Sequence, residues 1–259
     1  MFTTNHIIWL IISFLLIGAG LYFLLKKRPP LRLVLKRASI FAVIAEAIRL
    51  FSTVEMVPST DGSMMYPYLD VGQLPLHLCS IQMIFIFYTR FAKDCKFREN
   101  LLAFMYPTCG VGAAFSLFIP IVFDETITVS QAFTHPLAYQ YFLYHVMLIL
   151  LGLYIPFSKE FEIKPRHYLS TVGLLGAMGF VSIFLNSVFA SPTYINGELV
   201  SVDYATNFFF TNRPSINIPL TTETHWFIYL GVIGTMVIVI AALFYLPFFV
   251  KAWKTKKSQ

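Results

Sequence analysis

The sequence predicts an all-α, polytopic membrane helix bundle with seven transmembrane helices, and three observations support this fold class. Hydrophobic residues make up 57% of the 259 residues and charged residues only 12%, whereas soluble domains carry roughly 25% charged residues. The mean hydropathy is +0.70. Seven apolar runs approach the length of about 20 residues that a helix needs to cross the hydrocarbon core. We therefore expect one membrane domain over residues 1–259.

The first three runs span residues 7–25, 38–54 and 74–91. Basic residues follow the first run instead of preceding it, and no small-residue cleavage site is evident, so we expect a retained helix and not a secretory signal. Pro75 is the second residue of the third run, and proline is tolerated at a helix start.

The other four runs span residues 101–122, 138–157, 168–189 and 226–250. In the first of these, Pro107 and Cys109 lie beside small residues, which predicts a kink or close helix packing. The chain has three cysteines, and their spacing is not typical of a metal site. We therefore expect no disulfide framework, no bound metal and no cofactor.

The basic residues predict the orientation of the chain. Apart from Arg49 and Arg213, every Lys and Arg follows the first, third, fifth or seventh run or, in the case of Arg90, lies at the end of the third. By the positive-inside rule this side is cytoplasmic, so the N-terminus is expected outside and the C-terminus in the cytoplasm. Orientation and attraction to anionic lipid explain the net charge of +6, and nothing indicates a nucleic-acid partner. Among the outer loops, residues 190–225 are long enough to form a lid or a re-entrant segment.

An imidazole and a thiol open the third run, in the stretch Leu-Pro-Leu-His77-Leu-Cys79. Ionisable side chains within a bilayer are costly and mark functional sites. Counting inward at about 1.5 Å per residue places six polar groups about 5 to 12 Å beneath the outer boundary. The six groups are those of Glu46, Arg49, His77, Cys79, His145 and Asn186. Their common depth predicts a cavity that opens towards the outer leaflet.

The roles within this cluster are assigned from helical spacing. Cys79 shares a helix face with Gln82, whereas His77 and Cys79 are about 200° apart in a regular helix. His145 is therefore the better base for a Cys79 nucleophile. If the helix is broken near Pro75, His77 is an alternative candidate for the base.

The other polar groups have structural alternatives. Glu46 and Arg49 are three residues apart and are expected to form an ion pair, either structural or substrate-binding. Asn186 is expected to bond between helices or to bind substrate.

Together, the seven runs, the His77-Leu-Cys79 stretch and His145 resemble the bacterial YwaF-like integral membrane proteins, which are grouped with the transmembrane-protein-164 family of eukaryotes. The resemblance implies a multi-pass protein of a bacterial plasma membrane. The eukaryotic branch of the family resembles an acyltransferase that moves acyl chains between phospholipids through a cysteine. The resemblance maps this cysteine onto Cys79, with His145 as the expected partner. The stretch at residues 207–214 is similar to a family segment that begins Asn-Tyr and ends Lys-Pro. Here Phe208 and Arg213 replace the tyrosine and the lysine, and Asn207 and Arg213 are candidate substrate-binding residues.

Three functions remain open from the sequence. The first is a thiol-dependent lipid acyltransferase or acyl hydrolase, in which Gln82 or His77 stabilises the oxyanion. The second is a transporter or small-molecule binding protein, with Glu46, Arg49, His77 and His145 along a pathway. The third is a seven-helix receptor, although a retinal protein is disfavoured because the last run contains no lysine.

Overall fold

The computed structural model describes residues 2–120, 122–125, 127–158, 160–195, 198–214 and 218–257. Lys159 of one predicted basic cluster, and residues 196, 197 and 215–217 of the predicted loop 190–225, lie outside these ranges. The described chain is mostly helical, and five of its helices are long and apolar enough to cross a membrane. They are α1 (Thr4–Lys27), α4 (Lys96–Phe118), α6 (Pro136–Tyr154), extended by η3 (Ile155–Phe157), α7 (Arg166–Val188) and α8 (Glu223–Lys257).

Two more helices lie on expected runs. Helix α2 (Leu31–Thr53) begins seven residues before the expected residue 38, because the basic segment continues the helix. Helix α3 has 14 residues, Leu78–Phe91, and begins four residues after the expected residue 74. The helical membrane character of the chain is confirmed, whereas the number of seven spans and the orientation of the termini stay predictions.

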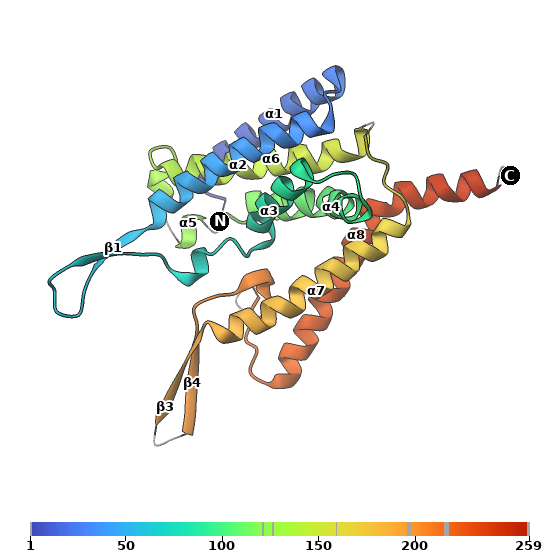
Figure 1. Cartoon of the computed structure of the whole chain (residues 1–259). Helices are drawn as coiled ribbons and strands as arrows, with labels where there is room; N and C mark the ends of the chain where they lie inside the picture. Colours follow the sequence, from blue (N-terminus) through green and yellow to red (C-terminus); the bar gives the residue numbers. More distant parts are fainter. Residues whose placement is uncertain are drawn as a thin grey trace. The chain divides into compact units, whose positions relative to one another are not determined.

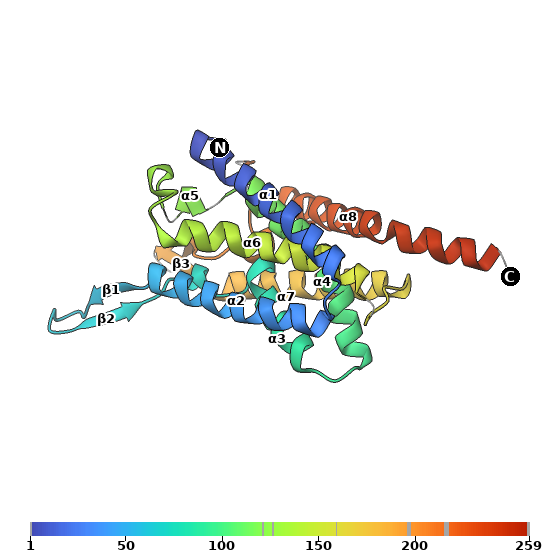
Figure 2. The ribbon, with the colours of Figure 1, turned by 90° about the horizontal axis from the view of Figure 1, so that it is seen from above.

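The chain divides into two compact units, and the expectation of a single domain stays a prediction. Unit 1 contains residues 1–69 and 79–163, and unit 2 contains residues 70–78 and 164–259. In unit 1, α6 packs against α1, α2 and α4, and α1 crosses α6 obliquely (Figure 2). The short helix α5 (Val122–Glu125) also contacts α6, and η2 (Val129–Gln131) contacts α1.

Aromatic stacking joins α1 to α6 near the start of both helices. The Trp9 ring stacks on Phe142 with centroids 4.7 Å apart, and its Nε1–H donates to the carbonyl of Ala132 (2.8 Å). Aromatic pairs of this kind contribute about 0.5–1.5 kcal/mol beyond their buried area. The indole therefore satisfies its polar atom while its ring fills the α1–α6 interface.

A glycine sets the distance between α4 and α6. A Cβ at Gly152 would lie 2.9 Å from the Tyr106 carbonyl oxygen and 3.0 Å from the Gly110 nitrogen. Both contacts are with backbone, so only glycine permits this approach. Pro107 lies inside α4 and Cys109 is fully buried beside Gly152. The predicted close packing around Cys109 is confirmed.

Two hairpins interrupt the predicted all-helical pattern. In unit 1, β1 (Glu55–Pro58) pairs with β2 (Met65–Tyr68) and extends beyond the end of α2 (Figure 1). Asp61 closes its turn by accepting from the hydroxyls of Ser59 and Ser63 and from the Ser63 N–H. These bonds, led by that from Ser59, lower the pKa of Asp61 to about 2.

In unit 2, β3 (Ala190–Ile195) pairs with β4 (Glu198–Tyr204), within the predicted loop 190–225. Helix α7 packs against α8, where the hydroxyls of Thr171 and Tyr245 lie 2.9 Å apart. It also contacts the turn η4 (Phe208–Phe210). The described residues of the predicted loop therefore include a hairpin and a turn that packs on α7.

Candidate functional site

Cys79 lies in the first turn of α3 and is held against α4. Its thiol is 3.6 Å from the Ser116 hydroxyl. Because that hydroxyl donates to the Gly112 carbonyl (3.1 Å), the thiol is the donor to Ser116. The Cys79 carbonyl accepts from the Tyr144 hydroxyl of α6 (3.1 Å). Three helices of unit 1 therefore fix the position of the candidate nucleophile.

His145 is buried on α6, and its hydrogen bond defines its tautomer. Its Nδ1 lies 2.6 Å from the Tyr141 carbonyl oxygen. A carbonyl only accepts, so Nδ1–H donates, and in the neutral ring Nε2 carries the lone pair that a base requires. The rings of Tyr141 and His145 are also in contact, with centroids 4.4 Å apart.

Tyr141 connects the histidine to the cysteine side of the site. Its hydroxyl donates to the Ser116 carbonyl (2.8 Å), so Ser116 contacts Cys79 through its side chain and Tyr141 through its backbone. Within the described residues, no hydrogen bond joins Cys79 directly to His145. Proton transfer between them therefore requires a bridging molecule or a change of rotamer, as is common in unliganded active sites.

Gln82 lies on the same side of α3 as Cys79, as its spacing predicts. Its Nε2–H donates to the Thr108 hydroxyl (3.0 Å), and its Oε1 accepts from the Cys109 thiol (3.3 Å). The side chain is fully buried. The side chains of Cys79 and Gln82 thus both contact α4, and the Gln82 amide is hydrogen-bonded there.

Glu46 and Arg49 form the ion pair that their spacing predicts. The Arg49 Nε–H donates to Glu46 Oε2 (3.0 Å), and a second guanidinium nitrogen contacts Oε1. Both side chains are partly buried, 15% exposed for Arg49 and 29% for Glu46. The bidentate geometry is the stronger form of such a pair.

His77 lies in unit 2 and precedes the helix, so the expectation that it shares a regular helix with Cys79 is wrong. Pro75 and Leu76 form a turn, and α3 begins at Leu78. The His77 ring makes an edge contact with Phe208, with centroids 5.0 Å apart. The structure thus has the break near Pro75 that leaves His77 open as an alternative base.

Asn186 of α7 binds the turn that holds Phe208. Its Oδ1 accepts from the Phe208 N–H (2.8 Å) and the Thr206 hydroxyl (2.9 Å). Its Nδ2 donates to the Phe208 carbonyl (3.1 Å) and to Thr211 Oγ1 (2.9 Å). The amide is fully buried and bonded on both its oxygen and its nitrogen. Asn186 therefore bonds to the turn at residues 206–211, and its role in binding substrate stays a prediction.

Asn207 and Arg213 close the same segment on itself. Asn207 accepts from the backbone N–H groups of Asn212 (3.1 Å) and Arg213 (3.3 Å) and donates to the Arg213 carbonyl (2.9 Å). Phe209 and Phe210 adopt left-handed φ values of 56° and 55°, which are strained for bulky residues. The Asn186 and Asn207 hydrogen bonds hold this strained turn, while the Arg213 side chain is exposed.

Ser116, Tyr141 and Tyr144 are the residues that sequence reasoning missed. The site was predicted from the depths of charged, imidazole, thiol and amide side chains, and hydroxyl side chains are not among these. Tyr141 precedes His145 by four residues, which is the spacing of neighbours on one helix face. The predicted six-residue cavity combines residues of both units and stays a prediction.

A family model for the TMEM164 family matches residues 1–245 of the chain. Neither the curated proteins nor the solved structures contain a match to it.

Proposed function

Because the chain belongs to the TMEM164 family, we propose that it is a membrane-embedded, thiol-dependent lipid acyltransferase. Its substrates would be membrane phospholipids or other lipid-linked acyl esters. The observation that carries the proposal is the placement of the Cys79 thiol in the first turn of α3, against Ser116, with His145 bonded to Tyr141 of the same network. The resemblance assigns the nucleophile to the same cysteine.

The reaction has two balanced steps. The Cys79 sulfur attacks the carbonyl carbon of a lipid ester, a C–S bond forms, and the ester C–O bond breaks. His145 takes the thiol proton at Nε2 and returns it to the departing lysolipid oxygen. A hydroxyl of the acceptor lipid then attacks the thioester carbonyl carbon and gives its proton to His145. A C–O bond forms, the C–S bond breaks, and His145 passes the proton to the departing Cys79 sulfur.

The oxyanion of each step needs hydrogen-bond donors. The first backbone N–H groups of a helix have no partner within the helix, and those of α3 are adjacent to Cys79. The side-chain candidates for the same role are Gln82, about one helical turn after Cys79, and His77, two residues before it in the sequence. Donors of this kind contribute on the order of 10²–10³ in rate when correctly placed.

The proposed setting is the plasma membrane of a bacterium, with seven spans, an outer N-terminus and a cytoplasmic C-terminus. The distribution of Lys and Arg supports this orientation. It puts Cys79 in the outer half of the membrane, where lipid esters of that leaflet are within reach.

The proposal is tested with purified protein, a phospholipid with a labelled acyl chain and an unlabelled lysolipid acceptor. We expect labelled diacyl product with the wild type and none with Cys79→Ala. Cys95→Ala is the matched control, because Cys95 is an exposed cysteine in the α3–α4 loop, and it should keep full activity. Full transfer by Cys79→Ala would refute the nucleophile, and labelled fatty acid without diacyl product would identify a hydrolase instead.

A transporter is the second candidate, and the ion pair of Glu46 and Arg49 favours it. Partly buried, paired charges are typical of solute pathways in membrane proteins. Uptake of a solute into proteoliposomes that resists thiol alkylation but is lost in Glu46→Gln would favour transport over acyl transfer.

A further inference from the structure

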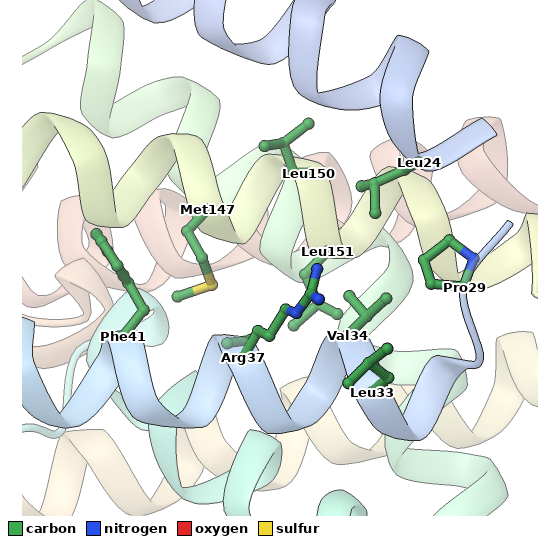
Figure 3. Close-up of a pocket in the computed structure, with 10 residues that line it drawn as sticks. Leu24, Pro29, Leu33, Val34, Arg37, Phe41, Met147, Leu150 and Leu151 are labelled. Atoms are coloured by element: carbon green, nitrogen blue, oxygen red, sulfur yellow. The ribbon is translucent and has the colours of Figure 1, made fainter. Parts of the chain in front are cut away.

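Unit 1 contains an apolar pocket between α1, α2 and α6, at the end where α1 joins α2 (Figure 3). Its volume is about 280 Å³, just below the range of about 300–1,000 Å³ that is typical of ligand pockets. Leu24 contributes from α1, Val34 and Phe41 from α2, and Met147 and Leu151 from α6. This volume is large enough for part of one alkyl chain, and we call the apolar space between these residues the slot. It shares no lining residue with the Cys79 site.

Arg37 is the one charged residue among the ten described residues that line this pocket. Its side chain extends from α2 towards α6 (Figure 3) and is exposed. The ion pairs of the described residues include Arg32 and Arg98, which share Asp94, but none of them includes Arg37. Its guanidinium is therefore available to an external anion.

The surroundings of Arg37 select for an anion that is attached to an apolar chain. Helix α1, which forms one wall, is long and apolar enough to cross a membrane. Lys26, Lys27 and Arg28 end that helix, and Lys36 is next to Arg37 on α2. Basic pockets between membrane helices bind anionic lipid headgroups, and a guanidinium matches the geometry of a phosphate with two parallel hydrogen bonds.

We propose that this pocket binds an anionic phospholipid, with part of one acyl chain in the slot and the phosphate paired with Arg37. The site goes beyond the proposed acyl transfer, because it requires neither Cys79 nor His145. A bound lipid would also fill the gap between α1, α2 and α6, and would stabilise their packing by mass action.

The experiment measures lipid binding to the full-length chain in detergent by native mass spectrometry. Phosphatidylglycerol is the anionic probe, phosphatidylcholine the zwitterionic probe, and inorganic phosphate the probe without an acyl chain. We expect phosphatidylglycerol to bind more tightly than phosphatidylcholine, and inorganic phosphate not to displace it. Arg37→Gln should lower the affinity for phosphatidylglycerol about tenfold, because a charge-assisted hydrogen-bonded pair is lost.

Two further variants separate a defined site from general attraction to a basic surface. Lys36→Gln removes the same charge from the neighbouring exposed position and should leave phosphatidylglycerol affinity nearly unchanged. Val34→Phe fills the slot and should lower the affinity for both lipids. The unfolding temperature of the lipid-free protein should stay unchanged. Equal losses in Arg37→Gln and Lys36→Gln, equal affinity of the wild type for the two lipids, or unchanged binding in Val34→Phe would each overturn the proposal.

Discussion

At the scale of single residues, the position of the Cys79 thiol depends on one hydroxyl, that of Ser116 on α4, which lies 3.6 Å away. Helical spacing predicted that Cys79 and Gln82 share one side of α3, and both side chains bond to α4. Helical spacing also predicted the ion pair of Glu46 and Arg49, which the structure contains. The partners Ser116 and Tyr141 could not be identified in this way, because which hydroxyl faces a thiol depends on how neighbouring helices pack.

Ser116 supplies the first prediction at this scale. Ser116→Ala removes the acceptor of the Cys79 thiol, and we expect acyl transfer to fall about tenfold as the thiol loses its fixed orientation. Ser13→Ala is the matched control, because Ser13 is buried on α1 and its hydroxyl has no hydrogen-bond partner among the described residues. Rates are measured with the labelled phospholipid, and unfolding temperatures with both variants. An unchanged rate in Ser116→Ala would contradict the role of this contact.

At the scale of elements, the apolar runs predicted the helices, but the ends of the helices depend on local chemistry. Pro75 lacks a backbone N–H and is followed by a turn, so α3 begins at Leu78 and not at residue 74. The hairpin of β1 and β2 was missed, although Asp61-Gly62 is a turn signal, and Gly62 has the positive φ of 71° that such a turn needs. Strands of four residues are too short for an alternating pattern of apolar and polar residues to stand out beside the long apolar runs.

The α4–α6 crossing gives a prediction at the same scale. Gly152→Ala would place a Cβ against the backbone of Tyr106 and Gly110, and we expect a loss of about 1–3 kcal/mol in the free energy of unfolding. Separation of these helices should also lower activity, because Ser116 lies on α4 and Tyr141 on α6. Gly173→Ala on α7 meets nothing within 4 Å and should not destabilise. Equal unfolding temperatures for Gly152→Ala and wild type in detergent would show that the crossing tolerates a side chain.

At the scale of the whole molecule, composition was the strongest signal. The low charge content and seven apolar runs predicted a helical membrane protein, and the structure has that character. The expected common cavity depends on how α7 and the turn at Phe208 are placed against α3 and α6. A depth count gives height along the membrane normal but no direction around a helix, so it could not determine this placement.

The orientation of the chain is predicted by its basic residues and can be measured directly. Cys95 is exposed in the loop between α3 and α4, and a membrane-impermeant maleimide should label it only after the cells are permeabilised. Thr60→Cys, in the exposed turn between β1 and β2, should be labelled in intact cells, with the modified peptides identified by mass spectrometry. Labelling of Cys95 in intact cells would invert the topology and remove the outer-leaflet site.

The central claim is that Cys79 carries the acyl chain between lipids, and mapping the acyl group on the protein tests it most directly. Wild-type protein is incubated with phospholipid, quenched in acid, digested and analysed by mass spectrometry. We predict an acyl adduct on the peptide that contains Cys79, removed by hydroxylamine, and no adduct on the peptides with Cys95 or Cys109. Catalytic turnover without any adduct on Cys79, or with the acyl group on another residue, would contradict this account.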